Sequence, residues 1–239
     1  MNQGSYALAV TRRVLIPSPV TGPFFCSPTV DALWRCGQRT VLGRLTDTEY
    51  IFPPFWLTQA ASLAGSLPDE DEVILVAFGG SGILLPAIAK FNSNRKFGAT
   101  VRGCIFVDSD LPKDGANRFE VSADRSLKPY MQNESSHGWL PGWSEEALRS
   151  DVKDRPTRMR LMNASPRVPV ALYDERVSVP TNWPDVPCGY LDLTGEHVSA
   201  VEAANLGGWA VTVLEGSPLA PFVDPDMVAQ TLVELINQL

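Results

Sequence analysis

Three side chains with reactive groups stand next to apolar segments of this sequence. Ser81 lies in the glycine-rich turn 79–82, Asp108 directly follows an apolar run, and His197 stands beside Glu196 in a polar stretch after another run. A hydroxyl, a carboxylate and an imidazole are the groups that nucleophilic and acid–base catalysis use most often. These three residues are therefore the candidate catalytic residues.

Each candidate also has an ordinary structural interpretation. Ser81 could be a nucleophile, or its hydroxyl could cap the helix that follows, which is the interpretation we favour. Asp108 and Asp110 could act as bases, because burial raises a carboxyl pKa, but aspartate is also a common turn residue. His197 could transfer protons or be a solvated loop residue, and the only other histidine, His137, is expected at the surface.

The elements that must position these residues follow from the hydrophobic pattern. Short apolar runs bounded by Gly and Pro predict strands at residues 13–17, 40–45, 73–78, 102–107, 168–173, 189–193 and 209–214. Helical spacing predicts helices at residues 28–37, 57–67, 83–90 and 225–239. This alternation predicts an α/β fold with a mostly parallel central sheet and helices on both faces.

One segment departs from this alternation. Residues 112–162 are polar and helical in pattern, with tryptophans set among Pro and Gly, so we predict a small helical cap on a single domain spanning residues 1–239. The composition of the 239 residues agrees, since 44% are hydrophobic and 20% are charged, as in one globular domain with a large core.

The net charge and the cysteine positions limit the kinds of partner and cofactor that we expect. The net charge is -7 and no run of Lys or Arg exists to neutralise phosphates, which argues against nucleic acid as a partner. No window reaches the roughly 18 apolar residues of a membrane span, and no basic leader is seen, so a cytoplasmic protein is expected. The four cysteines are far apart and are expected to be reduced core thiols: Cys26, Cys36, Cys104 and Cys188. We expect no metal and no cofactor.

The glycine-rich turn 79–82 has two functional interpretations. A strand, a glycine-rich turn and a helix could bind a phosphate group, but this turn lacks the Lys of a phosphate-binding loop. The same arrangement could be a nucleophile elbow, in which a strained turn lifts a catalytic side chain above the ends of the strands. The rest of the chain favours the elbow.

On these motifs the sequence resembles the α/β-hydrolase family, nearly from end to end. Residues 17–23 are similar to the family's "HSP-x-x-GP" loop beside the oxyanion site, and residues 105–112 to its "FVDAGLP" strand. Residues 214–224 stand where the family has a "GGH" loop before the last helix. The resemblance implies the α/β-hydrolase fold.

The same resemblance implies that the usual catalytic residues are missing. Its register places the nucleophilic serine of the family at Gly79 and the catalytic histidine at Pro218. The acid falls near Glu196 and His197, after a strand. Ordinary hydrolysis by a serine and a histidine is therefore not expected, because neither group stands at its position.

The loops of this family would build a substrate pocket, although aromatic residues and prolines also make plain loop packing. The pocket floor would consist of Val20, Thr21, Phe78 and Gly79, and Gly80 and Pro218 would also contact the substrate. The pocket mouth would be lined by Tyr50, Phe52, Phe55 and Trp56. Two tryptophans would close the pocket from the cap, Trp139 and Trp143.

The leading hypothesis is a non-hydrolytic enzyme of this fold that acts on a natural-product intermediate, either a peptide or a polyketide. It would promote epimerisation, isomerisation or cyclisation by shape and by substrate assistance, and it is similar in character to the bottromycin-type peptide epimerases. One alternative is a hydrolase with Ser81 as a displaced nucleophile; another is a non-catalytic binding or scaffold protein. A homodimer is compatible with each.

Overall fold

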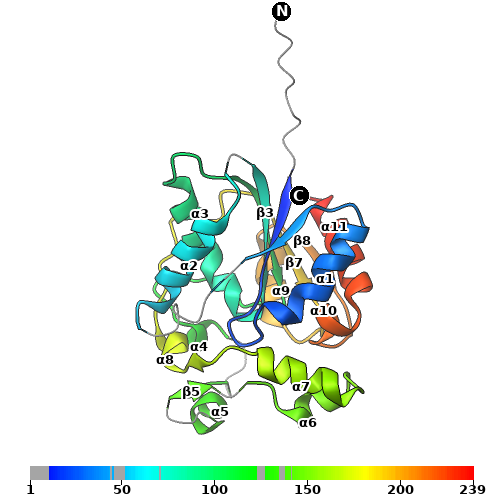
Figure 1. Cartoon of the computed structure of the whole chain (residues 1–239). Helices are drawn as coiled ribbons and strands as arrows, with labels where there is room; N and C mark the ends of the chain where they lie inside the picture. The colour runs from blue at the N-terminus through cyan, green and yellow to red at the C-terminus, as the bar shows by residue number, and fades with distance from the viewer. Residues whose placement is uncertain are drawn as a thin grey trace, which may run out of the picture.

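The computed structural model describes residues 11–43, 45, 52–69, 71–122, 127–134, 138–140 and 142–239. A six-stranded, entirely parallel sheet forms the centre of the molecule (Figure 1). Its strands, in spatial order, are β2 (Thr40–Leu42), β1 (Arg12–Ile16), β3 (Glu72–Phe78), β4 (Thr100–Val107), β7 (Cys188–Asp192) and β8 (Ala210–Val213). The predicted parallel sheet is confirmed.

The central strands are buried on both faces, which explains their continuous apolar sequences. In β3 the residues from Val73 to Phe78 are all buried, and so are the last residues of β4. Phe78 pairs with Val107, and Val107 pairs with Leu191 in β7. The chain therefore leaves β3, β4 and β7 at neighbouring points on the carboxyl edge of the sheet.

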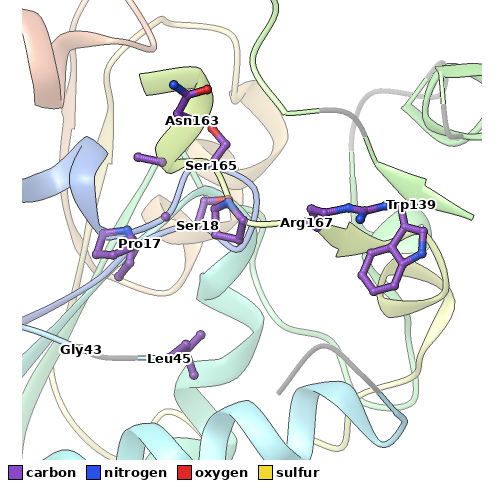
Figure 2. A pocket seen from close by; sticks show the side chains of 12 residues that line it. Pro17, Ser18, Gly43, Leu45, Trp139, Asn163, Ser165 and Arg167 are labelled. Carbon is purple, nitrogen blue, oxygen red and sulfur yellow. The ribbon is translucent and has the colours of Figure 1, made fainter. Parts of the chain in front are cut away.

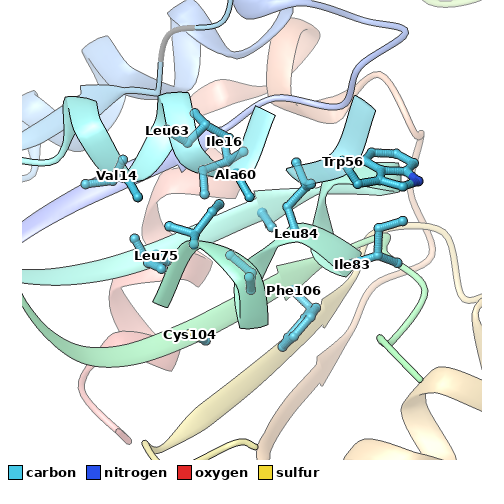
Figure 3. Close-up of a cluster of buried hydrophobic side chains, with 14 of the residues drawn as sticks. Val14, Ile16, Trp56, Ala60, Leu63, Leu75, Ile83, Leu84, Cys104 and Phe106 are labelled. Carbon is cyan, nitrogen blue, oxygen red and sulfur yellow. The ribbon is translucent and has the colours of Figure 1, made fainter. Parts of the chain in front are cut away.

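Helices cover the two faces of the sheet as two layers. One core packs against the helices α2 (Phe55–Ser66), α3 (Leu85–Ser93) and α9 (Val198–Leu206), and Figure 3 shows how side chains of α2 meet those of β1, β3 and β4. The opposite core packs against α1 (Pro23–Arg35), α10 (Ala220–Val223) and α11 (Pro225–Ile236). A short 3-10 helix, η2 (Gly79–Leu84), links β3 to α3.

A group of short elements gathers at the carboxyl end of the sheet, away from the C-terminus (Figure 1). We use the name cap for these elements: α4 (Arg118–Val121), α5 (Leu127–Glu134), β5 (Trp139–Leu140), α6 (Glu145–Arg149), α7 (Arg155–Ala164), β6 (Val168–Pro169) and α8 (Ala171–Asp174). The prediction that residues 168–173 form a strand of the central sheet is wrong. β6 has two residues, pairs antiparallel with β5, and is followed by α8. Pro169 has no N–H to donate to a central ladder, which restricts it to such short pairings.

The structure also tests the predicted start of the first helix and the predicted burial of the four cysteines. Helix α1 begins at Pro23, earlier than predicted, because a proline fits the first turn of a helix. The four cysteines are free, and three of them are buried, but Cys36 is exposed and is not a core thiol. Within the described residues, no helix has the length and apolar content needed to cross a bilayer, and no group of three or more potential metal ligands occurs.

Candidate active site

The turn after β3 is open at its first residue. Gly79 has a positive φ of 52°, a conformation that side-chain-bearing residues rarely adopt. A Cβ atom at this position would lie 3.3 Å from the hydroxyl oxygen of Ser18. The register that places Gly79 at the nucleophile position of the family stays a prediction. In this structure the turn presents backbone, with Ser18 beside it.

Ser81 lies behind the turn and not in an accessible position. Its side chain is fully buried, and its hydroxyl lies 2.9 Å from the carbonyl oxygen of Ile16 and 2.8 Å from that of Phe78. A hydroxyl held by two backbone acceptors inside the protein is not placed to attack a substrate. The predicted capping role is wrong as well, because α3 has Leu84 at its N-cap position and no side-chain cap. Ser81 instead ties η2 to β1 and β3.

Asp108 stands at the end of β4 with a strained backbone, its φ being 44°. Its carboxylate accepts a hydrogen bond of 2.6 Å from the backbone N–H of Leu193. Burial raises the pKa of Asp108 to about 7, opposed by that hydrogen bond and aided by the negative charges of Asp192 and Glu196. Asp108 is thus a carboxyl group that can both take and return a proton near neutral pH.

Ser109 holds the ends of two strands together next to this carboxylate. Its hydroxyl donates a hydrogen bond of 2.6 Å to the carbonyl oxygen of Gly79. Its carbonyl accepts one of 2.7 Å from the hydroxyl of Tyr190, whose oxygen accepts in turn from the Ser109 N–H. Asp108 and Gly79 are therefore fixed relative to each other.

Asp192, the last residue of β7, shapes the loop that carries His197. One carboxylate oxygen accepts from the backbone N–H groups of Thr194 and Gly195, at 3.0 and 2.8 Å. The other accepts from the N–H of His197 at 3.1 Å. Burial lowers the pKa of His197, and the positive charge of Arg118 lowers it further, against the opposing effect of Asp192 and Glu196. The imidazole is thus held in its neutral form.

Gly79, Asp108 and His197 line one cavity of about 230 Å³, which we name the elbow pocket. It is lined by Ser18, Thr21, Phe25, Phe78, Gly79, Val107, Asp108, Trp143, Leu193, Thr194, Glu196, His197, Pro218 and Pro221. Two of the three predicted catalytic residues, Asp108 and His197, share this pocket. So do five predicted substrate-binding residues: Thr21, Phe78, Gly79, Trp143 and Pro218.

A second cavity of about 570 Å³ lies between the cap and the loops after β1 and β2, and we name it the cap pocket (Figure 2). It is lined by Pro17, Ser18, Gly22, Pro23, Gly43, Leu45, Trp139, Asn163, Ala164, Ser165, Pro166 and Arg167. Trp139, predicted to close the substrate pocket, lines this cavity and not the elbow pocket. Ser18 lines both cavities.

The other predicted pocket residues lie elsewhere. Phe55 and Trp56 begin α2 and are buried in the core, and their N–H groups donate to the Glu175 carboxylate at 2.7 and 3.1 Å. The side chain of Phe52 is 76% exposed and lines neither cavity. The helix begins earlier than predicted, so its first turn faces inward instead of forming a pocket mouth.

Val20 and Gly80, also predicted to bind the substrate, do not line the elbow pocket. Val20 packs against the core and lines neither cavity. A Cβ atom on Gly80 would lie 3.4 Å from the Nε atom of Arg118, so Gly80 faces a buried arginine and not the pocket floor. Tyr50 lies outside the described residues.

Asp110 has a structural partner that the sequence did not indicate. Its carboxylate forms a buried ion pair with Arg118, and the guanidinium group of Arg118 lies 6.0 Å from the centre of the Tyr173 ring. A buried carboxylate that is paired in this way is not a free base. Of the two aspartates after β4, only Asp108 lines the elbow pocket.

Ser18 is the site residue that sequence reasoning missed. Its hydroxyl makes no hydrogen bond to any other described residue, and its side chain is mostly buried between the two cavities. The available signal was its place between Pro17 and Pro19 in the loop thought to lie beside the oxyanion site. The two flanking prolines have no N–H group, so neither can donate a backbone hydrogen bond to the Ser18 hydroxyl.

Known proteins match this chain in structure but not in sequence. No protein-family model matches, and neither does any curated protein. The structure is similar to that of an extracellular α/β-hydrolase from a Paenibacillus species, which is described as sharing structural and functional homology with tobacco salicylic acid binding protein 2. The TM-score is 0.72 and the sequence identity 17%, and the match covers 95% of this chain and 98% of that one. The chain has the α/β-hydrolase fold.

Two more proteins of this fold illustrate its range. Tomato methylketone synthase I, in complex with 2-tridecanone, has a TM-score of 0.64 and 12% identity, over 96% of this chain and 98% of its own. A pyrethroid hydrolase from Sphingobium faniae has a TM-score of 0.64 and 16% identity, over 94% and 96%. The α/β-hydrolase fold predicted from the sequence is thereby confirmed, and its chemistry has to be argued from the site.

Proposed function

We propose that this α/β-hydrolase-fold protein is an enzyme that moves a proton on a carbon next to a carbonyl group. The observation that carries the proposal is Asp108, a largely buried carboxyl with a pKa of about 7 that lines the elbow pocket. A carboxylate of this kind is a stronger base than a solvated one and is still half ionised at neutral pH.

The step has a simple balance. Asp108 takes the proton from the carbon, and the electron pair of the broken C–H bond forms the C=C bond of an enolate, whose negative charge moves to the carbonyl oxygen. The Ser18 hydroxyl, which has no other partner among the described residues, donates a hydrogen bond to that oxygen. Return of a proton to the same carbon from the other face gives the epimer, and return to a different atom gives an isomer.

His197 suits the second proton position. It lines the same pocket as Asp108, and its lowered pKa keeps the imidazole neutral, with one nitrogen that donates and one that accepts. A two-base epimerase uses one group on each face of the reacting carbon. Three titratable groups are among the described residues that line this pocket: Asp108, Glu196 and His197. Asp108 and His197 follow different strands.

The size and lining of the pocket support a partly apolar group on the substrate. Phe25, Phe78, Val107 and Trp143 make the wall apolar, and the absence of a side chain at Gly79 leaves room at the end of β3. A peptide or polyketide intermediate of natural-product synthesis has such groups next to carbonyls. Tomato methylketone synthase I, with a ketone bound, supports the idea that this fold also serves carbonyl chemistry that is not named as hydrolysis.

A hydrolase is the second candidate, and one observation favours it. The Ser18 hydroxyl lies 3.3 Å from where a Cβ atom of residue 79 would be, close to the place that a serine nucleophile at that position would occupy. In this alternative Ser18 attacks the carbonyl carbon and Asp108 or His197 takes its proton. Ser81, buried and bonded to backbone carbonyls, does not suit that role.

One compound can test both candidates. N-acetyl-L-phenylalanine ethyl thioester has an exchangeable proton next to its carbonyl and a bond that a hydrolase would cleave. Incubation in D2O with mass spectrometry and chiral chromatography is expected to give a deuterated, epimerised thioester. Asp108→Asn should reduce this exchange at least about 100-fold, the usual contribution of a general base.

The outcomes separate the alternatives. Release of N-acetylphenylalanine, with covalent labelling of Ser18 by a fluorophosphonate, would replace the proposal by the hydrolase. Exchange that is equal in Asp108→Asn and in the unmodified protein would remove Asp108 as the base. If neither the thioester nor a metabolite extract is changed while a compound is retained by the protein, the protein is a binding protein.

A further inference from the structure

Arg167 is the one ionisable side chain among the described residues that line the cap pocket. Its guanidinium group lies 5.2 Å from the centre of the Trp139 ring, and Figure 2 shows the side chain extended towards that ring. No carboxylate of the described residues forms an ion pair with Arg167. A cation held over an aromatic face, with no counter-charge from the described residues, is suited to bind an anion.

The rest of the cap pocket is mainly apolar. Pro17, Pro23, Leu45 and Pro166 contribute to its wall, and two polar side chains, Asn163 and Ser165, lie near the end of α7 (Figure 2). A single arginine at the rim of an apolar cavity suits a chain or ring that ends in one carboxylate, because a planar guanidinium matches a carboxylate with two parallel hydrogen bonds. A strongly hydrated polyanion would find too few donors here.

The elbow pocket has the opposite charge. Asp108 and Glu196 line it, and the one basic group among its described lining residues is His197, whose lowered pKa favours the neutral form. A carboxylate would be repelled from that pocket and attracted to Arg167. Because Ser18 lines both cavities, a substrate that spans them has only one favourable direction.

We infer that the cap pocket is a second substrate subsite, which binds the carboxylate end of an apolar acid through Arg167 and directs the neutral carbonyl end past Ser18 to Asp108. This inference rests on the proposed function for its second half. The binding half stands on the cap pocket alone and can be measured without any reaction.

The probe is 4-phenylbutyrate, compared with its neutral analogue 4-phenylbutanamide, with binding followed by calorimetry and by the indole N–H signals in NMR. The Trp139 signal is identified by its loss in Trp139→Phe. The acid should bind roughly fivefold more tightly than the amide, the effect of about 1 kcal/mol expected for one accessible ion pair, and the Trp139 signal should shift. Added salt should reduce the affinity of the acid only.

Two matched variants make the test specific. Arg167→Gln should abolish the preference for the acid, and Arg167→Lys should keep part of it. Arg160→Gln is the control, because Arg160 is also exposed, also lies over an aromatic ring, 5.2 Å from the centre of Phe24, and lines neither cavity. That control should bind the acid as the unmodified protein does.

The inference is overturned if acid and amide bind equally, if Arg160→Gln weakens the acid as much as Arg167→Gln does, or if the Trp139 signal does not move. These results are independent of the proposed function. Acid binding through Arg167 without any deuterium exchange would refute the proton-transfer enzyme and leave the carboxylate subsite, and exchange without acid binding would do the reverse.

Discussion

The elbow pocket and the cap pocket lie on either side of Ser18, and they differ in charge and in construction. The elbow pocket is built from the ends of β3, β4 and β7 and carries the carboxylates of Asp108 and Glu196. The cap pocket is built largely from loops and cap residues and carries one cation, Arg167. We infer from this difference that the strand ends hold reactive side chains in fixed positions, whereas the cap provides a charged side chain suited to select and orient a ligand.

After the loss of exchange expected in Asp108→Asn, the largest expected effect is a pH dependence that belongs to the elbow pocket only. In the proposed reaction Asp108 acts as a base when it is ionised, so its pKa of about 7 predicts that exchange rises with pH up to neutrality. Deuterium exchange of the thioester should be about fiftyfold slower at pH 5 than at pH 7, from the fraction ionised. Binding of 4-phenylbutyrate should stay nearly constant over this range. A flat exchange profile would contradict the role of Asp108.

The second effect concerns the free energy of unfolding, which the buried Asp108 carboxylate is expected to lower. The folded protein holds the Asp108 proton up to about pH 7, whereas the unfolded chain releases it near the ordinary value of about 4. Ionisation therefore opposes folding increasingly from pH 4 to 7, and the cost remains above pH 7. The amide side chain of Asp108→Asn can still accept from Leu193, so the stability advantage of this variant over the unmodified protein should grow by about 2.6 kcal/mol from pH 5 to pH 8.

Urea unfolding at several pH values measures this gain. Asp114→Asn is the control, because Asp114 lies in an exposed turn and lines neither pocket. A gain for Asp108→Asn that does not change with pH would mean that the carboxyl group is not the source of the cost.

A smaller effect is expected where the pockets meet. Ser18→Ala removes the hydroxyl proposed to bond the carbonyl oxygen, and the loss of one hydrogen bond predicts exchange about tenfold slower. Ser27→Ala is the control, because that hydroxyl donates to the Pro23 carbonyl at 3.1 Å and lines neither pocket. Faster exchange in Ser18→Ala would show that this hydroxyl hinders the reaction.

The smallest effect belongs to the cap pocket. Trp139→Leu keeps an apolar side chain but removes the aromatic face under Arg167, a contact of about 0.5–1 kcal/mol at an accessible site. Binding of 4-phenylbutyrate should weaken about threefold by calorimetry. Unchanged affinity would mean that the ring does not hold the guanidinium group in its binding position.

The sequence predicted the elbow pocket better than the cap pocket, for a physical reason. The continuous apolar runs of β3 and β4 indicate buried parallel strands, and the carboxyl ends of such strands must meet at one edge of the sheet. Gly79, Asp108 and His197 follow strands, so their convergence could be predicted from the chain alone.

The remaining residues depend on packing that the pattern does not contain. Arg167 meets Trp139 only because β5 and β6 pair outside the central sheet, which a two-residue strand cannot signal. Phe55 and Trp56 are aromatic residues after prolines, and only the true start of α2 turns them into the core. The orientation of Ser81 is decided by the 3-10 helix, where a tight turn was expected.

The carboxylate of Asp192 has a consequence for how the elbow pocket can deform. It bonds the N–H groups of three loop residues at once, so His197 cannot shift without breaking several hydrogen bonds together. Trp143, which precedes α6, also lines the elbow pocket, and its ring centre lies 6.1 Å from that of Phe25. The indole N–H of Trp143 has no hydrogen-bond partner among the described residues, so we expect a bulky substrate to displace this side chain more readily than the loop that carries His197.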